Sequence, residues 1–72
     1  MLIGHERYII QKGSEYLVGM PYDDTAFMRY SNSTYDAYRT KSFNTAIRVA
    51  RMIGGKVVVF NRLTGEVHGG WK

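Results

Sequence analysis

The sequence predicts an α+β domain in which one helix packs on one face of a small antiparallel sheet of four to five strands. Two stretches carry this prediction. Residues 42–54 have the periodicity and the end signals of one amphipathic helix, and residues 56–60 form a short apolar run. The other segments have the composition of strands or turns, so the expected element order is β-β-(β)-α-β-β. A single helix lying across the sheet is the simplest way to bury both apolar faces.

The chain is expected to begin with a β-hairpin. Arg7–Lys12 has strand composition, with a tyrosine and two isoleucines in sequence. Lys12-Gly13-Ser14 has the composition of a turn. Glu15–Met20 is then the returning strand of the hairpin.

The segment between the hairpin and the helix has less certain boundaries. Pro21–Thr25 contains the only proline and two adjacent acids, which indicates a loop. Ala26–Tyr30 is either a third strand or a short turn that leads into one. Ser31–Thr34 is a polar turn. Asp36–Thr40 alternates small, aromatic and basic residues, and is either a short strand or an extended lead-in to the helix.

The helix is predicted between Ser42 and Gly54. At about 100° per residue, its apolar side chains other than Met52, which lies on the polar side, fall within one arc. They are Phe43, Ala46, Ile47, Val49, Ala50 and Ile53. Ser42 can cap the first turn, because its hydroxyl accepts a hydrogen bond from a free backbone N–H. Gly54 can adopt the left-handed conformation that commonly ends a helix.

Two more strands are expected after the helix. Lys56–Phe60 contains four consecutive apolar residues, three of them β-branched, which indicates a strand that is covered on both faces or central in its sheet. Asn61–Gly65 has turn composition, and Glu66–His68 then pairs back as the last strand. Gly69–Lys72 is expected to be a loose tail unless Trp71 docks on the domain.

Length and composition restrict the possible classes of protein. The 72 residues make a single domain, residues 1–72, that contains no cysteine for a disulfide. Its core depends on apolar packing alone, and a homodimer would bury further apolar area. No apolar run approaches the roughly 20 residues of a membrane span, so a cytoplasmic protein is expected. The net charge of +4 suits contact with nucleic acid or with an acidic protein.

No catalytic, cofactor or metal site is expected, and the chain is predicted not to be an enzyme. Asp23-Asp24 is the only acidic pair, and no third acid follows at a spacing useful for a metal ion. Gly54-Gly55 follows a helix, whereas a phosphate cradle must precede one so that free N–H groups face the anion. No serine lies in a nucleophile elbow beside a base.

The two histidines lie near opposite ends of the chain. First and last strands can be neighbours in a sheet, so His5 and His68 are able to meet. Acid–base or metal chemistry would need a third group, such as Glu6 or Glu66. The sequence contains no motif that brings these groups together.

Basic and aromatic residues supply the candidate contacts with a partner. Aromatic rings set among cations are what single-strand nucleic-acid binders use. Tyrosine, methionine and arginine are also enriched in the cores of protein interfaces. The plainer interpretation is that the tyrosine rings are buried against the sheet and the arginines are solvated. The candidate contacts are Arg29, Tyr30, Tyr38, Arg39, Arg48, Arg51 and Met52.

A large part of the chain, from the hairpin to the strand after the helix, resembles small proteins encoded by phages and prophages of low-GC Gram-positive bacteria. The resemblance lies in the pattern Ala46-x-x-x-Ala50, in Gly54-Gly55 and in the Val-rich strand that follows, after a hairpin such as Tyr8–Met20. It implies a non-catalytic phage accessory protein that binds a host or phage protein, with inhibition of a host defence system as one role. It assigns no functional residue. The alternative is a small basic nucleic-acid-binding protein that uses a Tyr/Arg surface.

Overall fold

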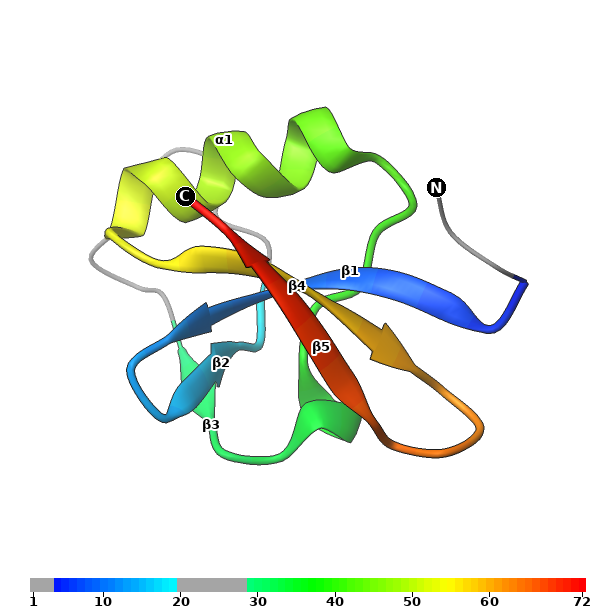
Figure 1. The fold of residues 1–72 in the computed structure, drawn as a ribbon. Coiled ribbons are helices and arrows are strands. Elements are labelled where there is room, and N and C mark those ends of the chain that lie inside the picture. The colour runs from blue at the N-terminus through cyan, green and yellow to red at the C-terminus, as the bar shows by residue number, and fades with distance from the viewer. Residues whose placement is uncertain (1–3, 20–28) are drawn as a thin grey trace.

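A five-stranded antiparallel sheet with one helix on it forms the domain (Figure 1). The computed structural model describes residues 4–19 and 29–72. The strands are β1 (Glu6–Lys12), β2 (Glu15–Leu17), β3 (Tyr30–Ser31), β4 (Lys56–Asn61) and β5 (Val67–Trp71). A 3₁₀ turn, η2 (Thr34–Asp36), and the helix α1 (Phe43–Ile53) lie between β3 and β4. The order across the sheet is β3-β2-β1-β4-β5, which confirms the predicted α+β class.

The longest strand pairing joins β1 to β4. Its register runs without interruption from Glu6 opposite Asn61 to Gln11 opposite Lys56. Side chains alternate between the two faces along each strand. Those packed with α1 are Tyr8, Ile10, Val57 and Val59, and those on the opposite face are Ile9, Val58 and Phe60. Because both sets are buried, β4 is covered on both faces, as the apolar run predicted.

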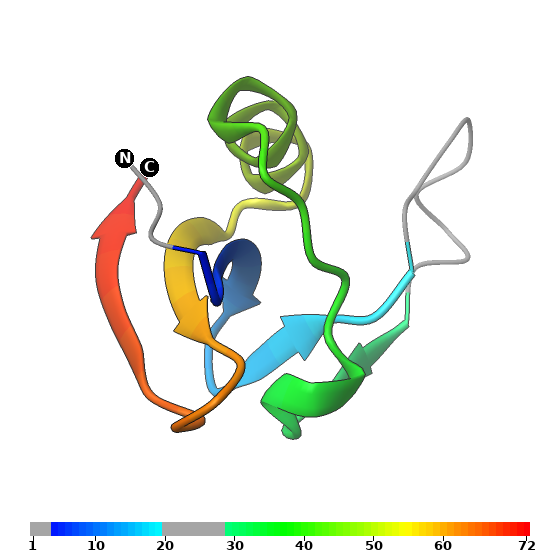
Figure 2. The same cartoon turned by 90° about the vertical axis from the view of Figure 1, so that its right-hand side faces the viewer.

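The face of the sheet away from α1 is covered by the segment that follows β3 (Figure 2). Ala37 is buried there and packs with the second set of strand side chains. The ring of Tyr35 lies edge-on to that of Phe60, with centroids 5.4 Å apart. A short connection thereby completes a second core that the helix cannot reach.

The same connection then passes the side of the sheet as extended chain. The Tyr38 N–H donates to the Leu17 carbonyl at 2.9 Å. Thr40 exchanges two backbone hydrogen bonds with Tyr8, at 2.8 and 3.0 Å. Of the two alternatives for Asp36–Thr40, the extended lead-in is correct for residues 37–40, and an isolated bridge between Thr40 and Tyr8 holds it to β1. Asp36 instead ends the 3₁₀ turn η2.

Helix α1 has the ends and the buried face that the sequence predicted. The Ser42 hydroxyl accepts from the Thr45 N–H at 3.2 Å, and Gly54 is left-handed with φ of 75°. Buried in the helix are Ala46, Val49, Ala50 and Ile53, while Phe43 and Ile47 pack at the edge of the same core. Among the described residues, no helix has the length and apolarity needed to cross a membrane.

The last strand is longer than predicted. Glu66–His68 was expected to pair, but β5 runs from Val67 to Trp71 and includes the expected tail. The Trp71 ring lies edge-on to the rings of Tyr8 and Phe43, with centroid distances of 6.5 and 5.7 Å. The tail therefore joins the sheet because Trp71 docks on the aromatic side chains beneath the first turn of α1.

Other predicted boundaries differ or lie outside the described residues. The second strand ends at Leu17, and Met20 of the predicted strand is not among the described residues. The predicted loop Pro21–Thr25 and most of Ala26–Tyr30 also lie outside them. The third strand begins at Tyr30 and takes in Ser31, which the sequence had assigned to a turn.

The tight approach of Gly55 to β1 gives a first prediction. A Cβ at Gly55 would lie 2.6 Å from the Gln11 carbonyl oxygen, a backbone atom that cannot rotate away. Gly55→Ala should therefore lower the free energy of unfolding by about 3 kcal/mol, measured by urea denaturation. Gly54→Ala is the control, because its Cβ would meet no atom within 4 Å. Its left-handed backbone alone should cost about 1 kcal/mol. Equal losses in the two variants would contradict the close approach.

Candidate functional site

The outer face of α1 gathers three of the candidate residues on one surface. Arg48 and Arg51 are exposed, and Met52 beside them is 50 % exposed. A hollow of about 280 Å³ lies against this face, bordered by Asn44, Ile47, Arg48 and Arg51. We call these five residues the outer α1 face.

The helical period explains why these residues lie together. The apolar arc of α1 turns toward the sheet, so positions 44, 48 and 51 face away from it. Ile47 lies at the boundary between the two arcs and is only half-buried, which adds an apolar wall to a polar rim. The hollow can therefore contact an apolar group and an acidic group at the same time.

Among the described residues, no acidic side chain pairs with the two arginines of this face. Helix α1 contains no Asp or Glu, and within residues 4–19 and 29–72 neither Arg48 nor Arg51 forms an ion pair. A guanidinium offers a planar set of donors that matches a carboxylate with two parallel hydrogen bonds. The face is therefore chemically suited to carboxylates of a partner.

The candidate tyrosines are placed differently. Tyr30 and Tyr38 are partly buried and pack against the core between α1 and the sheet. The Lys12 ammonium also lies 5.8 Å from the centroid of the Tyr30 ring, so a cation already occupies a position over that ring. Arg29 and Arg39 are exposed beside these tyrosines. The seven candidates thus divide into a helix face and a set of residues on β3 and on the lead-in segment.

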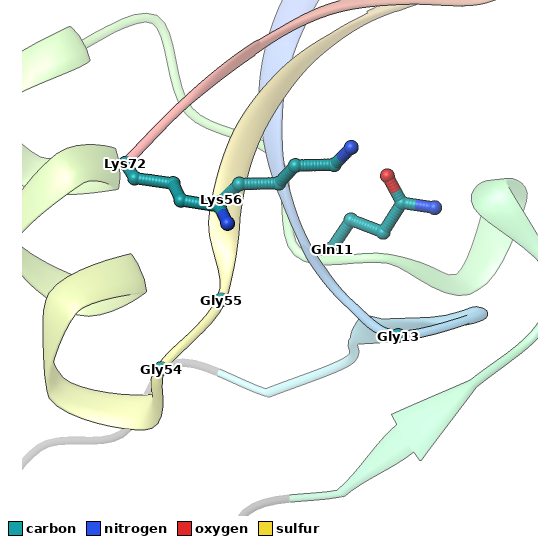
Figure 3. A pocket seen from close by; sticks show the side chains of 6 residues that line it. All are labelled: Gln11, Gly13, Gly54, Gly55, Lys56 and Lys72. Atoms are coloured by element: carbon teal, nitrogen blue, oxygen red, sulfur yellow. The ribbon is translucent and has the colours of Figure 1, made fainter.

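A second hollow lies where β1, β4 and β5 meet the end of α1 (Figure 3). Its volume is about 230 Å³, and it is bordered by Gln11, Gly13, Gly54, Gly55, Lys56 and Lys72. None of these residues was a candidate from the sequence. Only the register of β1 with β4 and the extension of β5 bring Lys56 and Lys72 to the same end of the sheet.

The histidines do not assemble a site with each other. The His68 Nε2 lies 3.2 Å from a carboxylate oxygen of Glu6, while His5 is exposed in the turn before β1. His68 is itself 60 % exposed, so this pair lies at the surface. Among the described residues, no group of three or more His, Cys, Asp and Glu side chains is arranged to hold a metal ion.

Comparisons with known proteins return no relative: no family model and no curated protein matches the sequence, and no solved structure matches the fold. The function is therefore inferred from the residues and geometry of this chain.

The difference in burial between Tyr38 and Arg39 gives a second prediction. Tyr38→Ala should lower the free energy of unfolding by about 2 kcal/mol, because its ring packs on the core. Arg39→Ala should change it by less than about 0.5 kcal/mol, because the side chain is exposed. Urea denaturation followed by circular dichroism measures both. A Tyr38→Ala variant as stable as the parent would show that the ring is free to stack on a ligand.

Proposed function

We propose that this chain is a non-catalytic protein-binding module whose outer α1 face contacts an acidic surface of its partner. The observation that carries the proposal is the pair Arg48 and Arg51, which borders a hollow walled by Ile47 and has Met52 exposed beside it. Arginine and methionine are among the residues enriched at interface cores. The two arginines have no ion-pair partner among residues 4–19 and 29–72, and Met52 beside them is exposed and flexible. Both features support binding to a protein surface.

The partner surface is expected to combine carboxylates with an apolar side chain. Carboxylates of the partner pair with the two guanidinium groups, and its apolar group packs against Ile47 and Met52. The net charge of +4 accelerates the encounter with such an acidic surface. Binding should consequently weaken as ionic strength rises, because part of the attraction acts between exposed charges.

The resemblance to phage proteins supplies the class of partner in this proposal. The chain acts as a phage accessory protein in the host cytoplasm, and its partner is a host or phage protein. Inhibition of a host defence system is the role that this proposal assigns to it. The basic outer α1 face excludes mimicry of DNA by that face as the mode of inhibition, because a DNA mimic must itself be acidic.

Nucleic-acid binding through a Tyr/Arg surface is the alternative that an experiment must separate. The exposed arginines could contact phosphates, but Tyr30 and Tyr38 are partly buried and pack against the core. Stacking on free rings supplies much of the affinity of single-strand binders. The packing of these two rings therefore favours a protein partner.

Affinity capture with matched variants gives the third prediction. The immobilised chain should retain one or a few proteins from a lysate of the source organism, identified by mass spectrometry. The triple variant Arg48→Ala, Arg51→Ala, Met52→Ala should bind the purified partner at least about 100-fold more weakly, as expected when clustered interface contacts are truncated. Isothermal titration calorimetry measures the two dissociation constants.

The control variant removes the same charge elsewhere. Lys41→Ala with Arg62→Ala removes two exposed cations from other segments and should bind as the parent does. If the control variant binds the partner as weakly as the triple variant does, the outer α1 face acts only through its net charge, which contradicts the proposal.

Titration with single-stranded and duplex oligonucleotides at two salt concentrations tests the nucleic-acid alternative. Salt-sensitive binding that the triple variant loses would favour the nucleic-acid alternative.

A further inference from the structure

The hollow at the end of the sheet combines positive charge, open space and the half-buried Lys56 (Figure 3). We propose that it binds a phosphate group, as free phosphate or as a phosphomonoester, through the side chains of Lys56, Lys72 and Gln11. This site is separate from the outer α1 face and does not depend on the function proposed for that face.

Strand topology places the three residues at one end of the sheet, where they border the same hollow. Gln11 lies directly opposite Lys56 in the pairing of β1 with β4. Trp71 lies opposite Val57 in the pairing of β4 with β5, so Lys72 follows at the same end of the sheet. The adjacent strands β1 and β4 and the residue that follows β5 thus each contribute one long polar side chain to the border of one hollow.

Glycines keep this hollow open. Three of its six bordering residues are glycines, namely Gly13, Gly54 and Gly55. Gly70 of β5 also leaves room, because a Cβ there would lie 3.5 Å from Cδ of Lys56 and 3.7 Å from its Nζ. The aliphatic part of Lys56 therefore lies along Gly70, and the lysine is half-buried. A lysine held in this way loses less conformational entropy when a ligand binds.

The donors suit a phosphate better than a carboxylate. Within the part of the chain that the structure describes, no acidic side chain borders the hollow. The two ammonium groups carry three N–H donors each, and the Gln11 amide adds two more. A phosphate dianion offers more charge and more acceptor oxygens than a carboxylate, and lysine is a common phosphate ligand.

In contrast to a phosphate-binding loop, this hollow does not offer the N–H groups of its Gly54-Gly55 backbone to an anion. The N–H groups of Gly54 and Gly55 both donate to the Ala50 carbonyl, so neither is available to an anion. The hollow also adjoins the C-terminal end of α1, which carries partial negative charge. The site therefore depends on its side chains, and a competing explanation is that Lys56 and Lys72 only offset the helix dipole.

Titration with inorganic phosphate tests the proposal. The full chain is labelled with ¹⁵N and titrated at constant ionic strength, at a pH well above the second phosphate pKa of about 6. Saturable shifts should appear at the amides of Gly55, Lys56, Gly70 and Lys72. Lys56→Gln with Lys72→Gln should weaken binding about tenfold, equivalent to about 1.4 kcal/mol. Lys41→Gln with Arg62→Gln, which removes equal charge elsewhere, should leave the dissociation constant unchanged.

Further titrations distinguish free phosphate from a phosphomonoester, and they test the explanation that the lysines only offset the helix dipole. Methyl phosphate replaces inorganic phosphate to test a phosphomonoester, and acetate at the same concentration should give no saturable shift. If the lysines only offset the helix dipole, Lys56→Gln with Lys72→Gln lowers the melting temperature but leaves phosphate shifts unchanged, which overturns the proposal. Shifts that never saturate, or that spread over the whole surface, also overturn it.

Discussion

The pairing of β1 with β4 is the interaction on which the other elements depend. Both strands bury side chains on both of their faces, so each core of the domain is built on this pair. Helix α1 covers one face, and the short segment around Ala37 covers the other (Figure 2). A chain of this length has little apolar area to spare. Using both faces of one strand pair is how it obtains enough burial without disulfides.

The surfaces proposed for function are consequences of that arrangement. Gly55 approaches the backbone of Gln11 closely, which fixes where α1 ends against the sheet. The apolar side of α1 packs on the strands, so Arg48 and Arg51 point away from the sheet. Helix α1 carries no acidic residue to pair with them. The same close approach places Lys56 at the start of β4 beside Gln11. The junction of α1 with β4 therefore sets the positions of the residues in both proposed sites.

The helix–strand unit could be predicted from sequence because its signals are local. Ser42, Gly54 and the apolar arc each act within a few residues, and β4 is recognisable from composition alone. Features set by distant pairing could not be predicted. The docking of Trp71 depends on Tyr8 across the sheet, and the placement of Lys56 and Lys72 at one hollow depends on the β4–β5 register. Among the candidate contacts, the helical periodicity predicted which residues form the outer α1 face. It could not predict that the Tyr38 ring packs against the core.

Amide hydrogen exchange tests the central role of the β1–β4 pair most directly. The amides of Ile9 and Val58, which lie opposite each other, should exchange only through global unfolding, with protection equal to the free energy from urea denaturation. Amides of Gly69 and Gly70 in the outer strand β5 should exchange through smaller local openings. The account is contradicted if the amides of Ile9 and Val58 exchange as fast as those of β5.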